Sequence, residues 1–288
     1  MKPGILISTL TLGAALAATP LAAGANNEPT LLPPYTPAYE PKSVDERGLW
    51  MMADDSERLI STSELKIEDE ELTAYVERVL CDTVGKDRCA GVRIHILNVP
   101  AFNASMSANG AMTVWSGLLL RTRSEAQLAA VLGHEFAHFE MRHSLKGFQQ
   151  RRSASDAMSW IAVLGGLSQT NTLDTRWSIL GSVYQFSRGQ ETEADLLGLK
   201  YLANSPYPSR AASEVWQQLM EEADATASGR RMKKANLYRA GFFDTHPTEL
   251  NRADYLLTQA LVYRDTGDAR AKEHYAAIGK HLPRFLAD

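Results

Sequence analysis

Two histidines and a glutamate have the spacing that a catalytic metal site requires. His134, Glu135 and His138 form an H-E-x-x-H pattern inside a strongly helical stretch. Residues four apart lie on the same face of an α-helix, so both imidazoles could bind one metal ion. Glu135 lies close enough to reach a metal-bound water and could act as a general base. The pattern is typical of hydrolases that hold zinc with neutral imidazoles, and we expect one Zn2+ per chain.

These side chains can bind a metal only if a rigid, buried helix holds them. The pair Ser124 and Gln127, which precedes the motif, is typical of a capping box and predicts the start of that helix. Apolar residues such as Leu132 and Phe136 give the helix faces for burial. A charged helix with scattered histidines is the alternative, and the capped, apolar context argues against it.

A catalytic zinc takes three protein ligands and leaves its fourth position for water. His143 follows the motif by five residues, about 500° further round a continuing helix, and should therefore point away from the metal. Glu191 and Asp195 fit better, because they are four apart near the start of a second helical run at 191–202. One of them could bind zinc while the other orients a histidine through its free N–H, whereas Glu193 should point elsewhere. Acidic residues in a first helical turn can also simply complement the helix dipole, and without the histidine motif that reading would be preferred.

Taken in order, the two motifs resemble those of peptidase family M48, a family of zinc metallopeptidases with membrane and periplasmic members. The resemblance includes the flanking residues at 124–133 and 188–198, and it covers about residues 45–260. It implies a gluzincin-type metallopeptidase. It also implies the roles of five residues: His134, His138 and Glu191 as zinc ligands, Glu135 as the base, and Asp195 as a residue that orients a ligand.

A His-Pro motif further along the chain is another point of resemblance. The segment Thr245–Thr248 contains His246, and Arg252 follows four residues after it. The family places a histidine here near the metal and an arginine near the substrate, which implies catalytic roles for both residues. His246 could stabilise the oxyanion or fill the fourth zinc position. An ordinary loop histidine before a helix that begins with proline is the alternative.

The N-terminus indicates export. A basic start, an apolar run at 5–18 and small residues up to position 25 have the form of a secretory signal peptide. We expect residues 1–25 to be removed, with cleavage after Ala23 or Gly24 as alternatives, and the mature protein to be periplasmic. The apolar run is too short for a stable membrane span, although an uncleaved anchor is a further alternative.

Cys81 and Cys89 are the only cysteines of the chain. An even number of cysteines in an exported protein predicts a disulfide, here closing a small loop between a helix end and a strand. Two free thiols are the alternative. A cysteine-based zinc site is disfavoured, because two cysteines are too few and the histidine motif already accounts for zinc.

Composition and charge limit the classes of partner. The chain has 288 residues, 44% of them hydrophobic, and a formal net charge of −4. It is long enough to bury a sizeable core in one domain, and it lacks the basic balance expected of a nucleic-acid-binding protein. The apolar patch Trp160–Leu167 is too short to span a bilayer. It could make peripheral membrane contact or cover the cleft, although such a patch is more often core.

The order of elements predicts a mainly α (α+β) fold with a small antiparallel edge sheet beside the active-site helix. We expect a Pro-rich linker at 26–43, a metallopeptidase domain at 44–260 and a C-terminal helical hairpin at 261–288 that packs on the domain. The alternating stretch Val92–Leu97 predicts a strand, and Asn109–Gly110 predicts the turn of a β-hairpin.

In zinc peptidases of this kind, an edge strand beside the active-site helix can bind the substrate backbone by strand addition. Residues 111–116 are the candidate, and a plain structural strand is the alternative. The remaining expectations are helices at 45–59, 69–84, 209–222, 256–263 and 269–281, a long helical insertion at 146–187, and a mobile loop at 225–236.

These features predict an exported zinc metalloendopeptidase whose substrates are proteins or peptides. The resemblance further implies quality control of misfolded envelope proteins. A zinc-stabilised chaperone or assembly factor with suppressed proteolysis would carry the same zinc site. A purely structural zinc site is a third hypothesis, and the intact Glu135 weakens it.

Overall fold

The computed structural model describes residues 41–150, 152, 186–231, 252–263, 265 and 267–286. The chain divides into two compact units, Met1–Thr30 and Leu31–Asp288, and all the described residues belong to the second. Several expectations lie outside the described residues: the signal peptide, the linker up to residue 40, most of the insertion, the patch Trp160–Leu167 and His246.

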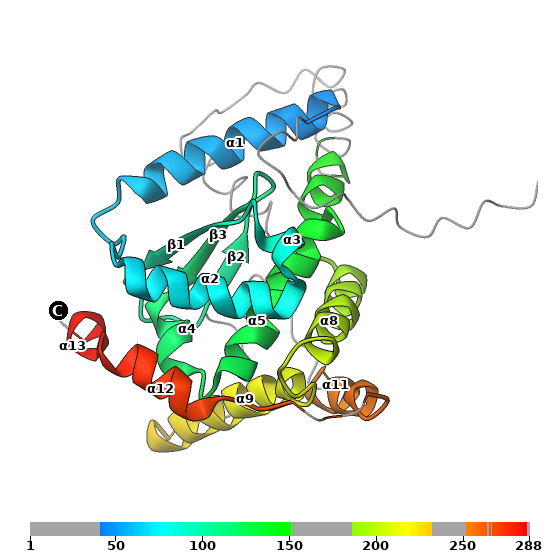
Figure 1. The fold of residues 1–288 in the computed structure, drawn as a ribbon. Helices are drawn as coiled ribbons and strands as arrows, with labels where there is room; N and C mark the ends of the chain where they lie inside the picture. The colour runs from blue at the N-terminus through cyan, green and yellow to red at the C-terminus, as the bar shows by residue number, and fades with distance from the viewer. Residues whose placement is uncertain are drawn as a thin grey trace, which may run out of the picture. The chain divides into compact units, whose positions relative to one another are not determined.

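The described residues form a mainly α fold with one small sheet, which confirms the expected fold class (Figure 1). The predicted helices at 45–59 and 69–84 and the predicted strand at 92–97 are all present. In chain order the elements are α1 Val44–Ser61, α2 Glu70–Val84, α3 Lys86–Cys89, β1 Arg93–Leu97, β2 Ala104–Met106, β3 Ala111–Trp115, α4 Ser116–Arg121, α5 Glu125–Glu140, α8 Arg188–Ala203, α9 Ala211–Gly229, α11 Arg252–Ala260, α12 Ala271–Gly279 and α13 Leu282–Phe285.

Polar side chains begin the two helices that carry the motifs. Ser124 accepts a hydrogen bond from the backbone N–H of Gln127 at the start of α5, as predicted. The side chain of Gln127 accepts from the N–H of Arg123 instead of completing the box. Ser187 and Gln190 form the full capping box at the start of α8, three residues earlier than expected. These caps satisfy N–H groups that the helices themselves leave without partners.

The sheet is mixed, not antiparallel as expected. Its order is β1-β3-β2, with β3 parallel to β1 and antiparallel to β2. The predicted hairpin joins β2 to β3, and Gly110 at its turn has a φ of 87°, a conformation that favours glycine. Alternation and turn residues identify the hairpin, but they do not say on which side the earlier strand pairs.

This strand order corrects the predicted substrate strand. Residues 111–116 were the candidate, but β3 is the central strand and is hydrogen-bonded along both edges. Its neighbour β2 is an edge strand, and β2 is the strand that packs against α5. The N–H of Ser107 and the C=O of Asn103 bond to β3, so alternation directs the N–H and C=O groups of Ala104 and Met106 outward.

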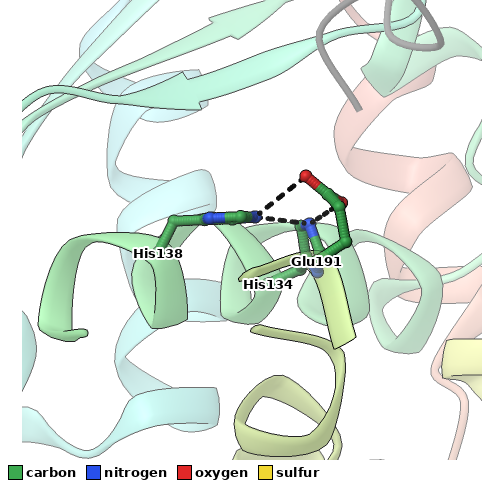
Figure 2. Close-up of side chains that lie close together, drawn as sticks. All are labelled: His134, His138 and Glu191. Atoms are coloured by element: carbon green, nitrogen blue, oxygen red, sulfur yellow. Dashed lines mark hydrogen bonds and ion pairs between the residues drawn. The ribbon is translucent and has the colours of Figure 1, made fainter. Parts of the chain in front are cut away.

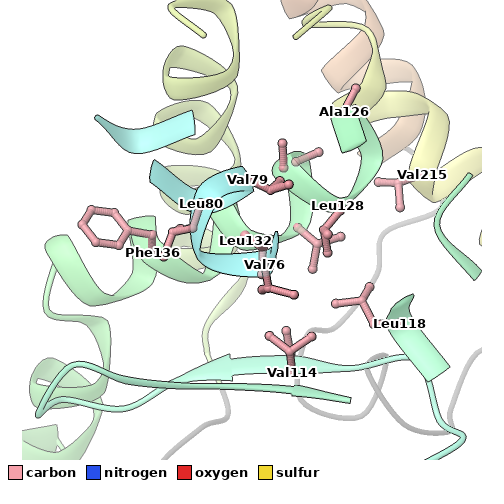
Figure 3. Close-up of a cluster of buried hydrophobic side chains, with 14 of the residues drawn as sticks. Val76, Val79, Leu80, Val114, Leu118, Ala126, Leu128, Leu132, Phe136 and Val215 are labelled. Atoms are coloured by element: carbon pink, nitrogen blue, oxygen red, sulfur yellow. The ribbon is translucent and has the colours of Figure 1, made fainter. Parts of the chain in front are cut away.

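The core surrounds α5, in which fifteen of sixteen residues are buried. The helices α2, α8 and α9 and the strand β2 all pack on it. Figure 3 shows Leu128 and Leu132 of α5 among apolar side chains of α2, β3, α4 and α9. Such enclosure on all sides makes α5 a rigid support for polar side chains.

The C-terminal part differs from the expected hairpin. Helix α11 packs on α9 and α8, whereas α12 packs on α5 and α2 (Figure 1). The segment that joins α11 to α12 is bonded to other parts of the chain. The backbone N–H of Asp268 donates to the C=O of Pro206, and the C=O of Ala269 accepts from the N–H of Ala126. Gly267 lies so close to Tyr207 that a Cβ would be 2.3 Å from its backbone.

Three further expectations have clear outcomes. Helix α9 continues to Gly229, so residues 225–229 are helical and not part of a loop. Ser209 does not cap α9; its hydroxyl donates to the C=O of Ala260. Cys81 and Cys89 form the predicted disulfide. Among the described residues, no helix has the length and apolar character that crossing a bilayer requires.

Candidate metal centre

The ligand atoms of three predicted residues converge between α5 and α8. The Nε2 atoms of His134 and His138 lie 3.1 Å apart. Glu191 reaches them from α8: its Oε2 lies 3.5 Å from Nε2 of His134 and its Oε1 lies 3.6 Å from Nε2 of His138 (Figure 2). All three side chains are buried. Within the described part of the chain, this is the one His, Cys, Asp or Glu group arranged to hold a metal.

The arrangement fits zinc. A tetrahedral ion with ligand distances of about 2.0–2.2 Å needs donor atoms about 3.3–3.6 Å apart, close to the three distances observed. Both carboxylate oxygens of Glu191 are buried and accept no hydrogen bond of good geometry from a described residue, although Nη1 of Arg252 lies 3.1 Å from Oε2 as an ion-pair partner. Burying a carboxylate is costly, and coordination of a metal ion would reduce the cost that the ion pair with Arg252 leaves.

Asp195 and Arg252 support the first histidine and the glutamate. Asp195 is one helical turn after Glu191, and its Oδ1 lies 3.0 Å from Nδ1 of His134. The guanidinium of Arg252 makes a bidentate contact with Asp195, at 2.9 and 2.5 Å, and its Nη1 lies 3.1 Å from Oε2 of Glu191. Burial alone would raise the pKa of the Asp195 carboxyl, but the hydrogen bond from His134 and the charge of Arg252 bring that pKa below its usual value.

The chain matches the family described as Peptidase family M48 over residues 66–260. The chain belongs to this family. One relative is the mitochondrial metalloendopeptidase OMA1 of Schizosaccharomyces pombe, which is 30% identical over 68% of this chain and 56% of its own length. Another is the β-barrel assembly-enhancing protease of Yersinia pestis, which is 26% identical over 76% of this chain and 48% of its own length. The human OMA1 metalloendopeptidase is 30% identical over 60% of this chain and 33% of its own length. The chain thus spans from a third to just over half of the length of these relatives.

In this member of the M48 family, Glu135 directly follows His134 on α5. The side chain of Glu135 is buried, and burial raises the pKa of its carboxyl to about 8. The charge of His134 lowers this pKa, and that of Glu191 raises it. A cation held by His134, His138 and Glu191 would oppose this rise and favour the charged carboxylate, which is the form that a general base needs.

Arg252 was predicted to lie near the substrate. In the structure its guanidinium contacts Asp195 and Glu191 and lies over the ring of Trp216, 4.1 Å from its centroid. The structure therefore places Arg252 beside the carboxylates of the metal centre. A direct contact with substrate remains a prediction, as does any role of His246.

The predicted direction of His143 is wrong, although His143 is not one of the three residues whose ligand atoms converge. Helix α5 ends at Glu140, and Arg142 adopts a positive φ of 55°, which turns the chain back. His143 is therefore not 500° round a continuing helix. It is fully buried, and its Nδ1 lies 2.9 Å from Nδ1 of His138. No glycine or proline marks this helix end, so the local sequence carries no signal for the turn.

Proposed function

We propose that this chain is a zinc-dependent metalloendopeptidase that hydrolyses peptide bonds of misfolded envelope proteins. The observation that carries the proposal is a buried Glu135 beside the converging donor atoms of His134, His138 and Glu191. The family assignment supports it, as do relatives named metalloendopeptidase and β-barrel assembly-enhancing protease.

The chain's own residues have distinct parts in the proposed reaction. When bound, Zn2+ would polarise a water and the scissile carbonyl. Glu135 takes a proton from the water and later delivers it to the leaving amine. Asp195 accepts from Nδ1 of His134 and so keeps the lone pair of its Nε2 directed at the metal position. Arg252 and His246 are proposed to stabilise the oxyanion, with His246 as a fourth zinc ligand as the alternative.

The proposed path for substrate is the free edge of β2. Ala104 and Met106 direct their backbone groups away from β3, and no described strand pairs with that edge. An extended peptide could add there as a further strand and lie alongside α5. We assign the binding of the substrate backbone to β2 and not to β3, because only an edge strand has unpaired N–H and C=O groups.

The proposed location is the periplasm, after removal of residues 1–25. The form of the N-terminal sequence and the relatives named for β-barrel assembly support it. N-terminal sequencing of the exported protein tests this point: the first residue should be Asn26, and a retained Met1 would contradict it.

Glu135→Gln tests the proposed activity. Glu135 is not a ligand, so the variant should keep one zinc per chain yet lose casein cleavage by roughly 10²–10⁴-fold. Metal analysis and initial rates measure the two quantities on the same sample. Cleavage within threefold of the unsubstituted protein, with zinc bound, would contradict the assignment of the base. A chaperone with suppressed proteolysis would instead show no cleavage that depends on Glu135.

A further inference from the structure

The two metal-facing histidines have different partners at their second nitrogen. Nδ1 of His134 faces the carboxylate of Asp195, whereas Nδ1 of His138 faces Nδ1 of His143 at 2.9 Å. The other nitrogen of His143, Nε2, lies 3.1 Å from Oε2 of Glu193 on α8. A chain of contacts therefore runs from Glu193 through His143 to His138.

The proton positions in the contacts from Glu193 through His143 to His138 follow from the state of His138, the metal-facing residue. An imidazole that binds a metal through Nε2 has its lone pair there and carries its proton on Nδ1. His138 must then donate from Nδ1, and His143 must accept at its own Nδ1. A neutral His143 consequently carries its proton on Nε2, where the carboxylate of Glu193 is placed to accept it. Each contact has one donor and one acceptor, so the tautomers are mutually consistent.

The surroundings hold this arrangement in place. His143 is fully buried, and Gln190 of the capping box donates to its backbone C=O at 3.4 Å. The ring of Phe186 stacks on that of His138, with centroids 3.8 Å apart and planes inclined by 20°. The left-handed turn at Arg142 brings His143 back to α5. The ring of His138 thus has little freedom to rotate.

We propose that His143 is a positioning residue for the metal ligand His138, and that Glu193 selects the tautomer in which His143 accepts. This inference rests on the ligand set of the proposed function. An outer partner that fixes the ring of a ligand commonly contributes 10–100-fold to metal affinity. His143 would therefore act on zinc binding without touching the metal.

The test is the zinc dissociation constant of the purified full-length chain, measured by competition with a chelator. His143→Leu removes the acceptor and should weaken zinc binding by roughly 10–100-fold. His143→Asn places a carbonyl oxygen near the position of Nδ1 and should restore affinity to within about threefold of the unsubstituted protein. Glu193→Ala should cause a smaller loss than His143→Leu, because it acts through His143 and its side chain is half exposed. Thr192→Ala, on the exposed side of α8, is the matched control.

Two measurements separate this role from simple packing. Thermal unfolding of the metal-free variants reports on folding, and if His143→Leu does not fold, His143→Ala replaces it in the comparison. Nitrogen NMR of the zinc-loaded protein should show His143 protonated at Nε2 and bare at Nδ1. The opposite tautomer, unchanged zinc affinity in the leucine or alanine variant, or equal losses in the asparagine and leucine variants would each overturn the proposal.

The ligand set itself is tested independently by His138→Ala. If that variant binds zinc as tightly as the unsubstituted protein, the proposed metal site fails. If it loses zinc while His143→Leu does not, the metal site stands and only the role of His143 is rejected.

Discussion

The polar and charged residues at the centre form one connected set. His134, Glu191, Asp195 and Arg252 are all buried, and each contacts at least one of the others. Burying such groups costs several kcal/mol per ion unless their hydrogen bonds and charges are compensated. Arg252 compensates both carboxylates, and a divalent cation would compensate Glu191 further. The cluster is therefore better suited to hold ligand atoms in place than to add stability.

Glu191→Ala tests the third ligand at this scale. Removing one of three protein ligands should leave little zinc after dialysis, whereas Glu193→Ala should retain far more because its carboxylate contacts no metal-facing atom. Zinc per chain by metal analysis is the measurement, with Thr192→Ala as control. Equal zinc loss in the Glu191 and Glu193 variants would show that the wrong carboxylate had been chosen.

At the scale of elements, the site depends on how closely α8 approaches α5. Gly198 lies against Gly133 and His134, and a Cβ on Gly198 would be 3.1 Å from the backbone N and 3.2 Å from the Cα of His134. The contact is made by backbone atoms, which cannot rotate away as a side chain could. This crossing sets the distance between the two helices that supply the histidines and Glu191.

Gly198→Ala should force α8 away from α5. We expect the free energy of unfolding to fall by about 1–3 kcal/mol, as for other overpacked cores, and zinc affinity to fall with it because Glu191 moves with α8. Gly229→Ala is the matched control: it lies at the end of helix α9, and a Cβ there meets nothing within 4 Å. Denaturant unfolding and chelator competition measure both effects. Identical behaviour of the two alanine variants would refute the close-crossing argument.

On the scale of the whole molecule, one buried histidine joins parts of the chain that are far apart in sequence. His274 of α12 accepts at Nδ1 from the hydroxyl of Tyr75, at 2.7 Å. Its Nε2 lies 3.2 Å from Oγ1 of Thr122 and 3.3 Å from the C=O of Leu119. The neutral ring with its proton on Nε2 satisfies these partners. Burial lowers the pKa of His274 below its ordinary value, against the weaker effects of its hydrogen bonds and of Glu125.

This burial predicts a pH dependence of stability. Above about pH 6.5, His274 is neutral in both the folded and unfolded chain and contributes no pH dependence. Below it, the unfolded chain binds the proton more readily, so the free energy of unfolding falls as pH falls, by at most about 1.4 kcal/mol per pH unit from this group. His274→Asn should be less stable at neutral pH and lose less stability on acidification. Denaturant unfolding at several pH values gives the difference between the two proteins; parallel curves would refute the prediction.

Much of the site was predictable from local pattern. The spacing of His134 and His138, and of Glu191 and Asp195, is a property of single helices, and helical geometry alone predicts that each pair shares a face. The caps, the hairpin turn and the cysteine pair are likewise short-range features. The family resemblance then related the two helices to each other, and the structure brings their ligand atoms together as expected.

The sequence by itself determined which side chains are chemically able to hold a metal ion or take up a proton, and which helices carry them. Only the tertiary structure decided how separate segments meet. It placed β3 in the centre of the sheet and β2 at the edge. It also packed α11 and α12 against different helices and brought Arg252 into contact with Asp195. It also turned His143 back onto His138. These outcomes depend on packing and hydrogen bonding between residues distant in the chain, which no local period or spacing encodes.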